Sequence, residues 1–207
     1  MGGKGPPVEW LSRLIDKVGA TWVDGEAARA LLAFGAGRPG IVALNARRVR
    51  TAQQYVDRAT CYAETGFEYE TVPAVAGEFF LEEFMSECER AVEKLWGLEP
   101  PDTVEDIPPG QMPVDVLFLI VDPGATRRDL VAQGMRAVLG RFPWLIMVLL
   151  TGEQLPTDAE LAAWQLTDVL KLEPALGPEE EFNARHVIGL LRRLLTKVRG
   201  GLMVGAG

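Results

Sequence analysis

Arginine residues gather at two places where the sequence pattern predicts that a strand ends and a helix begins. Arg47 and Arg48 follow the apolar run Ile41–Leu44. Arg127 and Arg128 follow a second apolar run in the same way. A guanidinium group binds phosphate or carboxylate through two parallel hydrogen bonds, and a helix N-terminus adds partial positive charge. The pattern therefore predicts an anion site, with surface ion pairs to some of the 29 acidic residues as the competing interpretation.

Three further polar residues are expected to share this edge with the arginines. Asn45 precedes the first arginine pair, Asp122 precedes a Pro-Gly pair, and Thr151 ends an apolar run. Asp122 also fits a turn residue, and Thr151 fits either a strand-end hydroxyl or the remnant of a catalytic group. The sequence assigns no catalytic residue. The candidate ligand-binding set is Asn45, Arg47, Arg48, Asp122, Arg127, Arg128 and Thr151.

The remaining chemistry-bearing residues argue against a metal centre, a disulfide framework and a hydrolase. Cys61 and Cys88 do not form a CxxC pair, and His186 is the single histidine, so a zinc site or a His-activated nucleophile lacks partners. None of the motifs GxSxG, HExxH or GxxxxGK[ST] occurs. The glycine-rich stretch Gly35–Gly40 precedes the first predicted strand, whereas a phosphate-binding loop follows it. We therefore expect no metal and no cofactor.

Composition and net charge limit the classes of partner that the chain can bind. The 207 residues carry a formal net charge of −8 and are 48% hydrophobic, which predicts a folded domain without the basic surface that nucleic acid or anionic lipid requires. The apolar runs Val116–Val121 and Trp144–Leu150 are much shorter than the roughly 20 residues of a membrane span. Met1–Pro7 lacks the apolar core of a signal peptide. These patterns predict a cytoplasmic chain that binds neither nucleic acid nor membrane.

Five strands that alternate with helices are expected to position the candidate residues. Apolar runs predict buried strands, and the alternation in Phe67–Val72 predicts an edge strand. Parallel neighbours require crossover helices, so the pattern predicts a three-layer α/β/α domain with a five-stranded, mostly parallel, flavodoxin-like sheet. Ligands in such folds bind at the carboxyl ends of the strands. The predicted strands are Ile41–Leu44, Phe67–Val72, Val114–Val121, Leu145–Leu150 and Val169–Leu172.

Helices are predicted from periodic apolar positions. One is expected within Ala46–Glu64, another along the stripe that begins at Phe80, and a last one opened by Pro178. The five prolines of Glu99–Pro113 predict a surface loop without regular structure.

Two capping signals mark further helix starts. Thr126 is followed three residues later by Asp129, and Thr157 by Glu160. A hydroxyl residue and an acid at this spacing satisfy each other's backbone N–H groups at a helix N-terminus. We therefore expect helices to begin after Thr126 and after Thr157.

The chain divides into one domain and two terminal segments. Residues 1–39 are expected to form an N-terminal helical extension with helices at Val8–Val18 and Gly25–Phe34. Residues 40–199 form the α/β domain, with residues 99–113 as a proline-rich insertion. Residues 200–207 are a glycine-rich flexible tail.

Four strand-and-turn segments carry a family resemblance: Glu64–Thr71, Pro113–Gly124, Phe142–Gly152 and Thr167–Pro174. On these segments the chain resembles a response-regulator receiver domain from about residue 39 to residue 197. The resemblance implies that the first and third strands are neighbours in the sheet. It thereby implies that the two arginine pairs lie close together.

The residues that carry receiver chemistry are replaced. Receivers hold magnesium with an acidic pair after the first strand and accept phosphate on an aspartate that ends the third. Here Asn45, Ala46 and Arg47 stand at the first position, and Leu119 or Ile120 stands at the second. The resemblance therefore implies a degenerate pseudo-receiver that neither binds magnesium tightly nor is phosphorylated in the usual way.

Two functions of different classes follow. The first is a non-enzymatic regulatory or scaffolding protein, a pseudo-receiver that acts by binding a protein partner or a second copy of itself. The second is a nucleotide- or phosphorylated-ligand-binding protein, or an unorthodox enzyme, that uses the basic edge at the carboxyl ends of the strands. A degenerate GTPase-like domain is a third interpretation of the same strand and helix alternation.

Overall fold

The computed structural model describes residues 23–37, 40–60, 67–75, 77, 80–99, 101–107, 116–152 and 154–172, together with residues 183, 186, 187, 189–191, 193 and 194. The predicted helix Val8–Val18, the start of the last helix at Pro178 and the tail 200–207 lie outside these residues.

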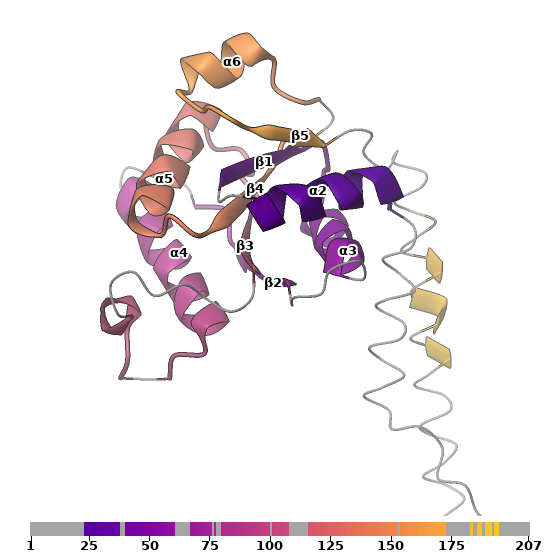
Figure 1. Ribbon diagram of the computed structural model, residues 1–207, viewed down its shortest axis with the longest axis horizontal. Helices are drawn as coiled ribbons and strands as arrows, with labels where there is room; N and C mark the ends of the chain where they lie inside the picture. Colours follow the sequence, from indigo (N-terminus) through magenta and orange to yellow (C-terminus); the bar gives the residue numbers. More distant parts are fainter. Residues whose placement is uncertain are drawn as a thin grey trace, which may run out of the picture.

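Five parallel strands form one sheet in the order β2-β3-β4-β1-β5 (Figure 1). This confirms the predicted three-layer α/β class with a five-stranded parallel sheet. It also confirms that Phe67–Val72 is an edge strand, since β2 pairs with β3 alone among the described strands. The strands are β1 (Gly40–Leu44), β2 (Phe67–Val72), β3 (Val116–Val121), β4 (Ile146–Leu150) and β5 (Leu170–Leu172).

Helices cover both faces of the sheet because the central strands are apolar on both sides. Every residue of β4 is buried, as are five of the six residues of β3. The helices α2 (Gly25–Gly37) and α3 (Val49–Thr60) pack on one face, through a cluster that includes Leu31, Tyr55 and Val148.

The opposite face is covered by α4 (Phe80–Trp96), α5 (Arg128–Arg141) and α6 (Asp158–Ala163) (Figure 1). Phe84, Met135 and Leu161 come from these three helices and join Leu119 and Leu149 of the sheet in one buried cluster. The α4 stripe predicted from Phe80 is therefore confirmed. The helix α2 packs on the sheet as part of the α/β domain.

The strand order corrects the expected position of the two arginine pairs. β1 pairs with β4 and β5, and β3 pairs with β2 and β4, so β1 and β3 are not neighbours. Receiver domains have the order 2-1-3-4-5, in which the first strand touches the third. In this chain β4 separates them by two strand spacings, or about 10 Å.

One of the two predicted capping boxes is present and the other is not. The Thr157 hydroxyl accepts from the Glu160 N–H at 3.2 Å, and the Thr157 N–H donates to the Glu160 carboxylate at 2.8 Å. The expected cap at Thr126 is wrong. Arg127 occupies the N-cap of α5 without a side-chain cap, because the Thr126 hydroxyl donates instead to the Val75 carbonyl at 2.7 Å.

The proline-rich insertion is also more ordered than expected. Within its described residues, Val104–Asp106 form a 3₁₀ turn whose N-cap is Thr103. Thr103 and Asp106 form a capping box of their own, and Val104 is buried. The prolines exclude an α-helix but leave room for this turn between them.

None of the helices in the described part of the chain is long and apolar enough to cross a membrane.

Candidate functional site

The connections of the sheet place its switch point between β1 and β4. The chain leaves β1 through α3 on one face of the sheet and leaves β4 through α6 on the other. Two neighbouring parallel strands whose following helices lie on opposite faces mark the switch point of an open α/β sheet, and ligands bind there at the carboxyl ends. The residues at this point are Asn45–Arg48 after β1 and Thr151–Gly152 after β4.

Hydrogen bonds join the two loops at the switch point. The Thr151 N–H donates to the Leu44 carbonyl at 3.0 Å, and the Thr151 hydroxyl donates to the same oxygen at 3.3 Å. The Gly152 N–H donates to the Ala46 carbonyl at 3.2 Å. Gly152 has a φ of +86° and open space where a Cβ would stand, so the positive φ rather than crowding favours glycine. Thr151 therefore acts as a strand-end hydroxyl that ties β4 to β1.

The β1 side of the switch point is basic. Arg47 and Arg48 are exposed in the loop, and Arg50 lies in the first turn of α3, where no acidic residue occurs. Basic residues in this position oppose the helix dipole and are retained at some cost in stability. A helix N-terminus with guanidinium groups in its first turn and in the loop before it concentrates positive charge of the kind that anions bind.

Asn45 stands between this basic loop and β4. Its side-chain Oδ1 is buried and has no hydrogen-bond partner among the described residues. A buried polar atom left without a partner costs about 1–3 kcal/mol, and such atoms are ordinarily paired with a protein group or a water molecule.

The second arginine pair, Arg127 and Arg128, follows β3, and its two members have different surroundings. The exposed Arg127 guanidinium donates to both carboxylate oxygens of Asp129, at 3.1 and 2.5 Å. This contact raises the pKa of Arg127 and lowers that of Asp129. Arg127 is therefore engaged by its own helix and is not directed toward the β1 loop.

Arg128 is half-buried beside Asp122. Burial lowers the pKa of Arg128, and the nearby Asp122 carboxylate opposes that effect. Its Nη1 is buried and lacks a hydrogen-bond partner within the part of the chain that the structure describes. The Asp122 carboxylate accepts from the Gly124 N–H at 3.0 Å, which makes Asp122 the turn residue that the sequence favoured.

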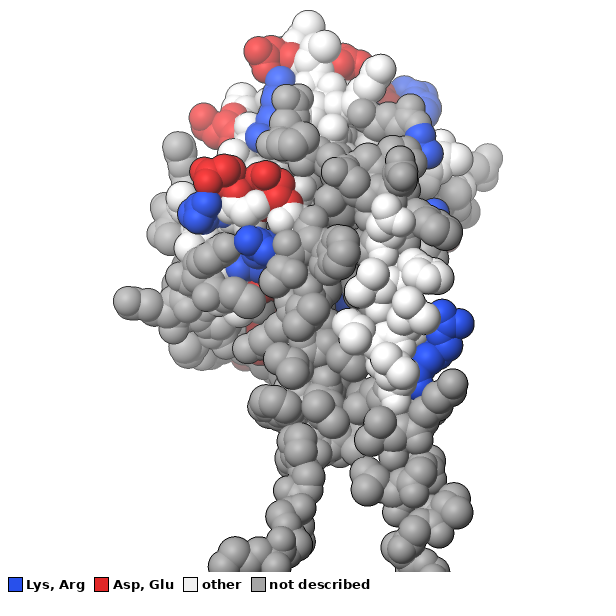
Figure 2. Space-filling view, turned by 90° about the vertical axis from the view of Figure 1, so that its right-hand side faces the viewer, with Lys and Arg blue, Asp and Glu red and all other residues white. Residues whose placement is uncertain are grey.

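The seven candidate residues therefore form two groups at one sheet edge. Asn45, Arg47 and Arg48 lie in the loop after β1, which is hydrogen-bonded to the segment that begins at Thr151. Asp122, Arg127 and Arg128 follow β3. Within the second group, Arg127 is paired with Asp129. Figure 2 shows that acidic side chains lie among the basic ones on the face it displays, where the described residues form no continuous basic surface.

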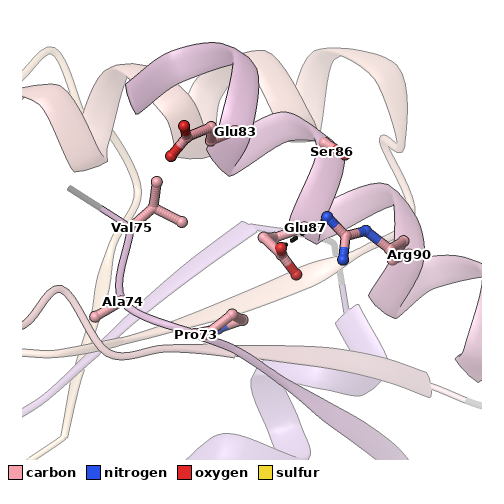
Figure 3. A pocket seen from close by; sticks show the side chains of 7 residues that line it. All are labelled: Pro73, Ala74, Val75, Glu83, Ser86, Glu87 and Arg90. Carbon is pink, nitrogen blue, oxygen red and sulfur yellow. Dashed lines mark ion pairs between the residues drawn. The ribbon is translucent and has the colours of Figure 1, made fainter. Parts of the chain in front are cut away.

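Sequence reasoning missed a cavity of about 470 Å³ at the carboxyl end of the edge strand β2 (Figure 3). Three of its lining residues follow β2 and four lie on one face of α4. The spacing of the α4 residues, at positions i, i+3, i+4 and i+7, was a usable signal of a shared face. The lining residues are Pro73, Ala74, Val75, Glu83, Ser86, Glu87 and Arg90.

Among the described residues, no group of three or more His, Cys, Asp and Glu side chains is placed to hold a metal ion. No protein-family model, curated protein or solved structure matches the chain.

Proposed function

We propose that this chain binds a phosphorylated small molecule at the carboxyl edge of its sheet, between the loops that follow β1 and β4. The observation that carries the proposal is the switch point, where α3 and α6 leave neighbouring strands toward opposite faces. This position is where open α/β sheets bind their ligands, whatever their chemistry. The ligand class then follows from the residues that the switch point presents.

The basic residues at the start of α3 favour an anionic ligand. Arg47, Arg48 and Arg50 surround the start of α3, and the first turn of that helix holds no acid. A phosphate group placed there meets both the helix N-terminus and the guanidinium groups. The loop lacks the glycines and the Lys-Ser/Thr pair of a P-loop, so binding relies on side chains more than on a backbone cradle.

Two buried polar atoms without partners among the described residues also favour a ligand site at the carboxyl edge of the sheet. Asn45 Oδ1 belongs to the β1 side and Arg128 Nη1 to the β3 side. Both side chains are only half-buried as a whole, so a ligand can contact their more exposed parts. An amide beside guanidinium groups suits a ligand that carries hydroxyl groups as well as phosphate, such as a nucleotide or a sugar phosphate.

The test is ligand-induced stabilisation with a matched pair of arginine variants. Inorganic phosphate and ATP, at constant ionic strength, are added to the wild type, to Arg48→Gln and to Arg127→Gln. A ligand at one hundred times its Kd stabilises the native state by about 2.7 kcal/mol, which is roughly 5–10 °C in Tm for a chain of this size. Arg127→Gln should keep that rise, because Arg127 follows β3, which β4 separates from β1. Arg48→Gln, in the loop after β1, should reduce it.

Equal shifts in the three proteins, or no shift in any, would overturn the proposal. Sodium chloride provides a second check, since added salt should shrink the wild-type shift by screening exposed charges.

A regulatory role through protein contact remains the second candidate, and two exposed apolar side chains favour it. Leu190 and Leu194 are 43% and 57% exposed and are the exposed large apolar side chains among the described residues. Their spacing of four residues places them on one helix face. In this proposal the chain is a pseudo-receiver that self-associates or binds a protein. Its receiver resemblance rests on sequence segments alone, because β4 separates β1 from β3.

Light scattering tests the second candidate. The wild type should form a dimer in the micromolar range, and the double variant Leu190→Glu/Leu194→Glu should be monomeric. A wild type that stays monomeric, or a variant with the same mass as the wild type, would remove the argument for this face.

A further inference from the structure

The cavity at the end of β2 is a separate candidate site with its own chemistry. Its volume of about 470 Å³ lies within the range of 300–1,000 Å³ that small-molecule sites occupy. Glu83 and Glu87 project from α4 toward Pro73–Val75, and Arg90 lies at the far end (Figure 3).

The walls of this cavity are held by contacts on both sides. The Val75 carbonyl accepts from the Thr126 hydroxyl at 2.7 Å, which fixes the segment after β2 against the turn after β3. On the α4 side, Phe80 and Phe84 stack with their ring centroids 5.4 Å apart, and both are buried. These residues flank Glu83 in the helix and hold this part of the α4 backbone in place, while the Glu83 side chain itself is exposed.

The charges that line the cavity do not cancel. Glu87 and Arg90 form an ion pair at 2.7 Å and compensate each other. Glu83 forms no hydrogen bond or ion pair within the described part of the chain, and neither does the Ser86 side chain. The cavity therefore carries one uncompensated carboxylate and a hydroxyl that accepts hydrogen bonds.

Pro73 and Arg90 also bear on the ligand class, beside the backbone groups of Ala74 and Val75. Pro73 has no backbone N–H and contributes only a carbonyl group. The one cationic group, Arg90, is already held by Glu87. A ligand that brings hydrogen-bond donors and a single positive charge matches this lining, whereas a carboxylate or a phosphate does not.

We propose that this cavity binds an aliphatic primary ammonium group, with Glu83 as its counter-ion and Ser86 as a hydrogen-bond acceptor. The ammonium group belongs either to a small amine or to a lysine side chain of a peptide, since both present the same three N–H donors. This site is independent of the anion site between β1 and β4.

The experiment is an NMR titration of the ¹⁵N-labelled full chain. The probes are n-butylammonium chloride, its neutral analogue n-butanol, and the peptide acetyl-Gly-Lys-Gly-amide. We expect n-butylammonium to shift the amide resonances of Ala74, Val75 and Ser86 in the millimolar range, and n-butanol to leave them unchanged. A stronger response to the peptide than to n-butylammonium would assign the site to a lysine side chain, and a weaker one would assign it to a small amine.

Two variants on the same helix decide whether Glu83 is the counter-ion. Glu83→Gln removes the charge at constant size and should raise the Kd of n-butylammonium about fivefold, the upper value for a partly exposed ion pair. Glu82→Gln removes an exposed charge that does not line the cavity and should leave the Kd within twofold. Equal effects of the two variants would overturn the proposal, as would unshifted resonances at 50 mM probe.

Discussion

A substitution at Gly134 should test how closely α4 and α5 approach each other. Gly134 is buried in the middle of α5, and a Cβ built there would lie 2.6 Å from Cδ1 and 2.9 Å from Cε1 of Phe84. Phe84 is 2% exposed and stacks on Phe80, so its ring cannot turn away. The helices therefore depend on the absence of a side chain at this position.

The expected stability change of Gly134→Ala is the difference between two effects. Alanine favours the helix by about 1 kcal/mol over glycine, and overpacking a buried contact costs about 1–3 kcal/mol. We expect a net loss of about 1 kcal/mol in the free energy of unfolding. Gly140→Ala, in the last turn of the same helix, has no neighbouring atom within 4 Å of the added Cβ and should gain about 0.5 kcal/mol.

Urea unfolding followed by circular dichroism measures both variants. A Phe84→Leu substitution in the Gly134→Ala protein should cost less than the same change in the wild type, because the smaller side chain relieves the contact. If Gly134→Ala stabilises the protein as Gly140→Ala does, the close approach of α4 and α5 is refuted.

Two other predictions concern the α6 cap and the buried thiol. Thr157→Ala should destabilise the fold by about 1 kcal/mol in urea unfolding, because it removes the hydroxyl that accepts from the Glu160 N–H. The Thr157 N–H and hydroxyl lower the pKa of Glu160. The contact therefore stabilises the fold above the ordinary pKa of glutamate, and this stabilisation is lost as the pH falls through the lowered pKa of Glu160. Thr157→Ala should lose less stability than the wild type over that acidic range. Cys88 is buried, and burial raises the pKa of its thiol to about 12. In a Cys61→Ser background, iodoacetamide at pH 8 should leave the native protein unmodified and add one group after unfolding in urea, as intact mass would report; rapid labelling of the native protein would contradict the burial of Cys88.

Local patterns in the sequence predicted the elements, because each element buries its own apolar side chains. The continuous apolar run of β3 reflects a strand that is covered on both faces. The alternation in β2 reflects a strand that is partly exposed at the edge of the sheet. The Thr157 capping box was predictable for the same reason, since both of its partners lie within four residues.

Features that depend on distant residues were not predictable in this way. Thr126 and Asp129 have the spacing of a cap, but the Thr126 hydroxyl bonds to Val75, which is 51 residues away in the sequence. The turn at Val104–Asp106 did carry a local signal in Thr103 and Asp106, which the surrounding prolines obscured. For the arginines the sequence left an anion site and surface ion pairs as alternatives, and the contact of Arg127 with Asp129 is one such ion pair.

Strand order was the largest gap, because hydrophobic patterns specify that a strand is buried without specifying its neighbours. β1, β3 and β4 are similarly apolar. Their order is decided by how the crossover helices pack on the two faces, which is a property of the whole chain.

The place of β1 in the sheet also constrains how the protein is made. β1 is synthesised first among the strands, yet its two neighbours are β4 and β5. At about 5–20 residues per second, the ribosome needs roughly 5–20 s to extend the chain from Leu44 to Ile146. During that interval Val42 and Leu44, which are fully buried in the finished domain, have neither of their native neighbour strands. The nascent chain therefore carries an apolar strand without its native partners for about half of the 207 residues, and a fragment that ends before β4 leaves that strand open to aggregation.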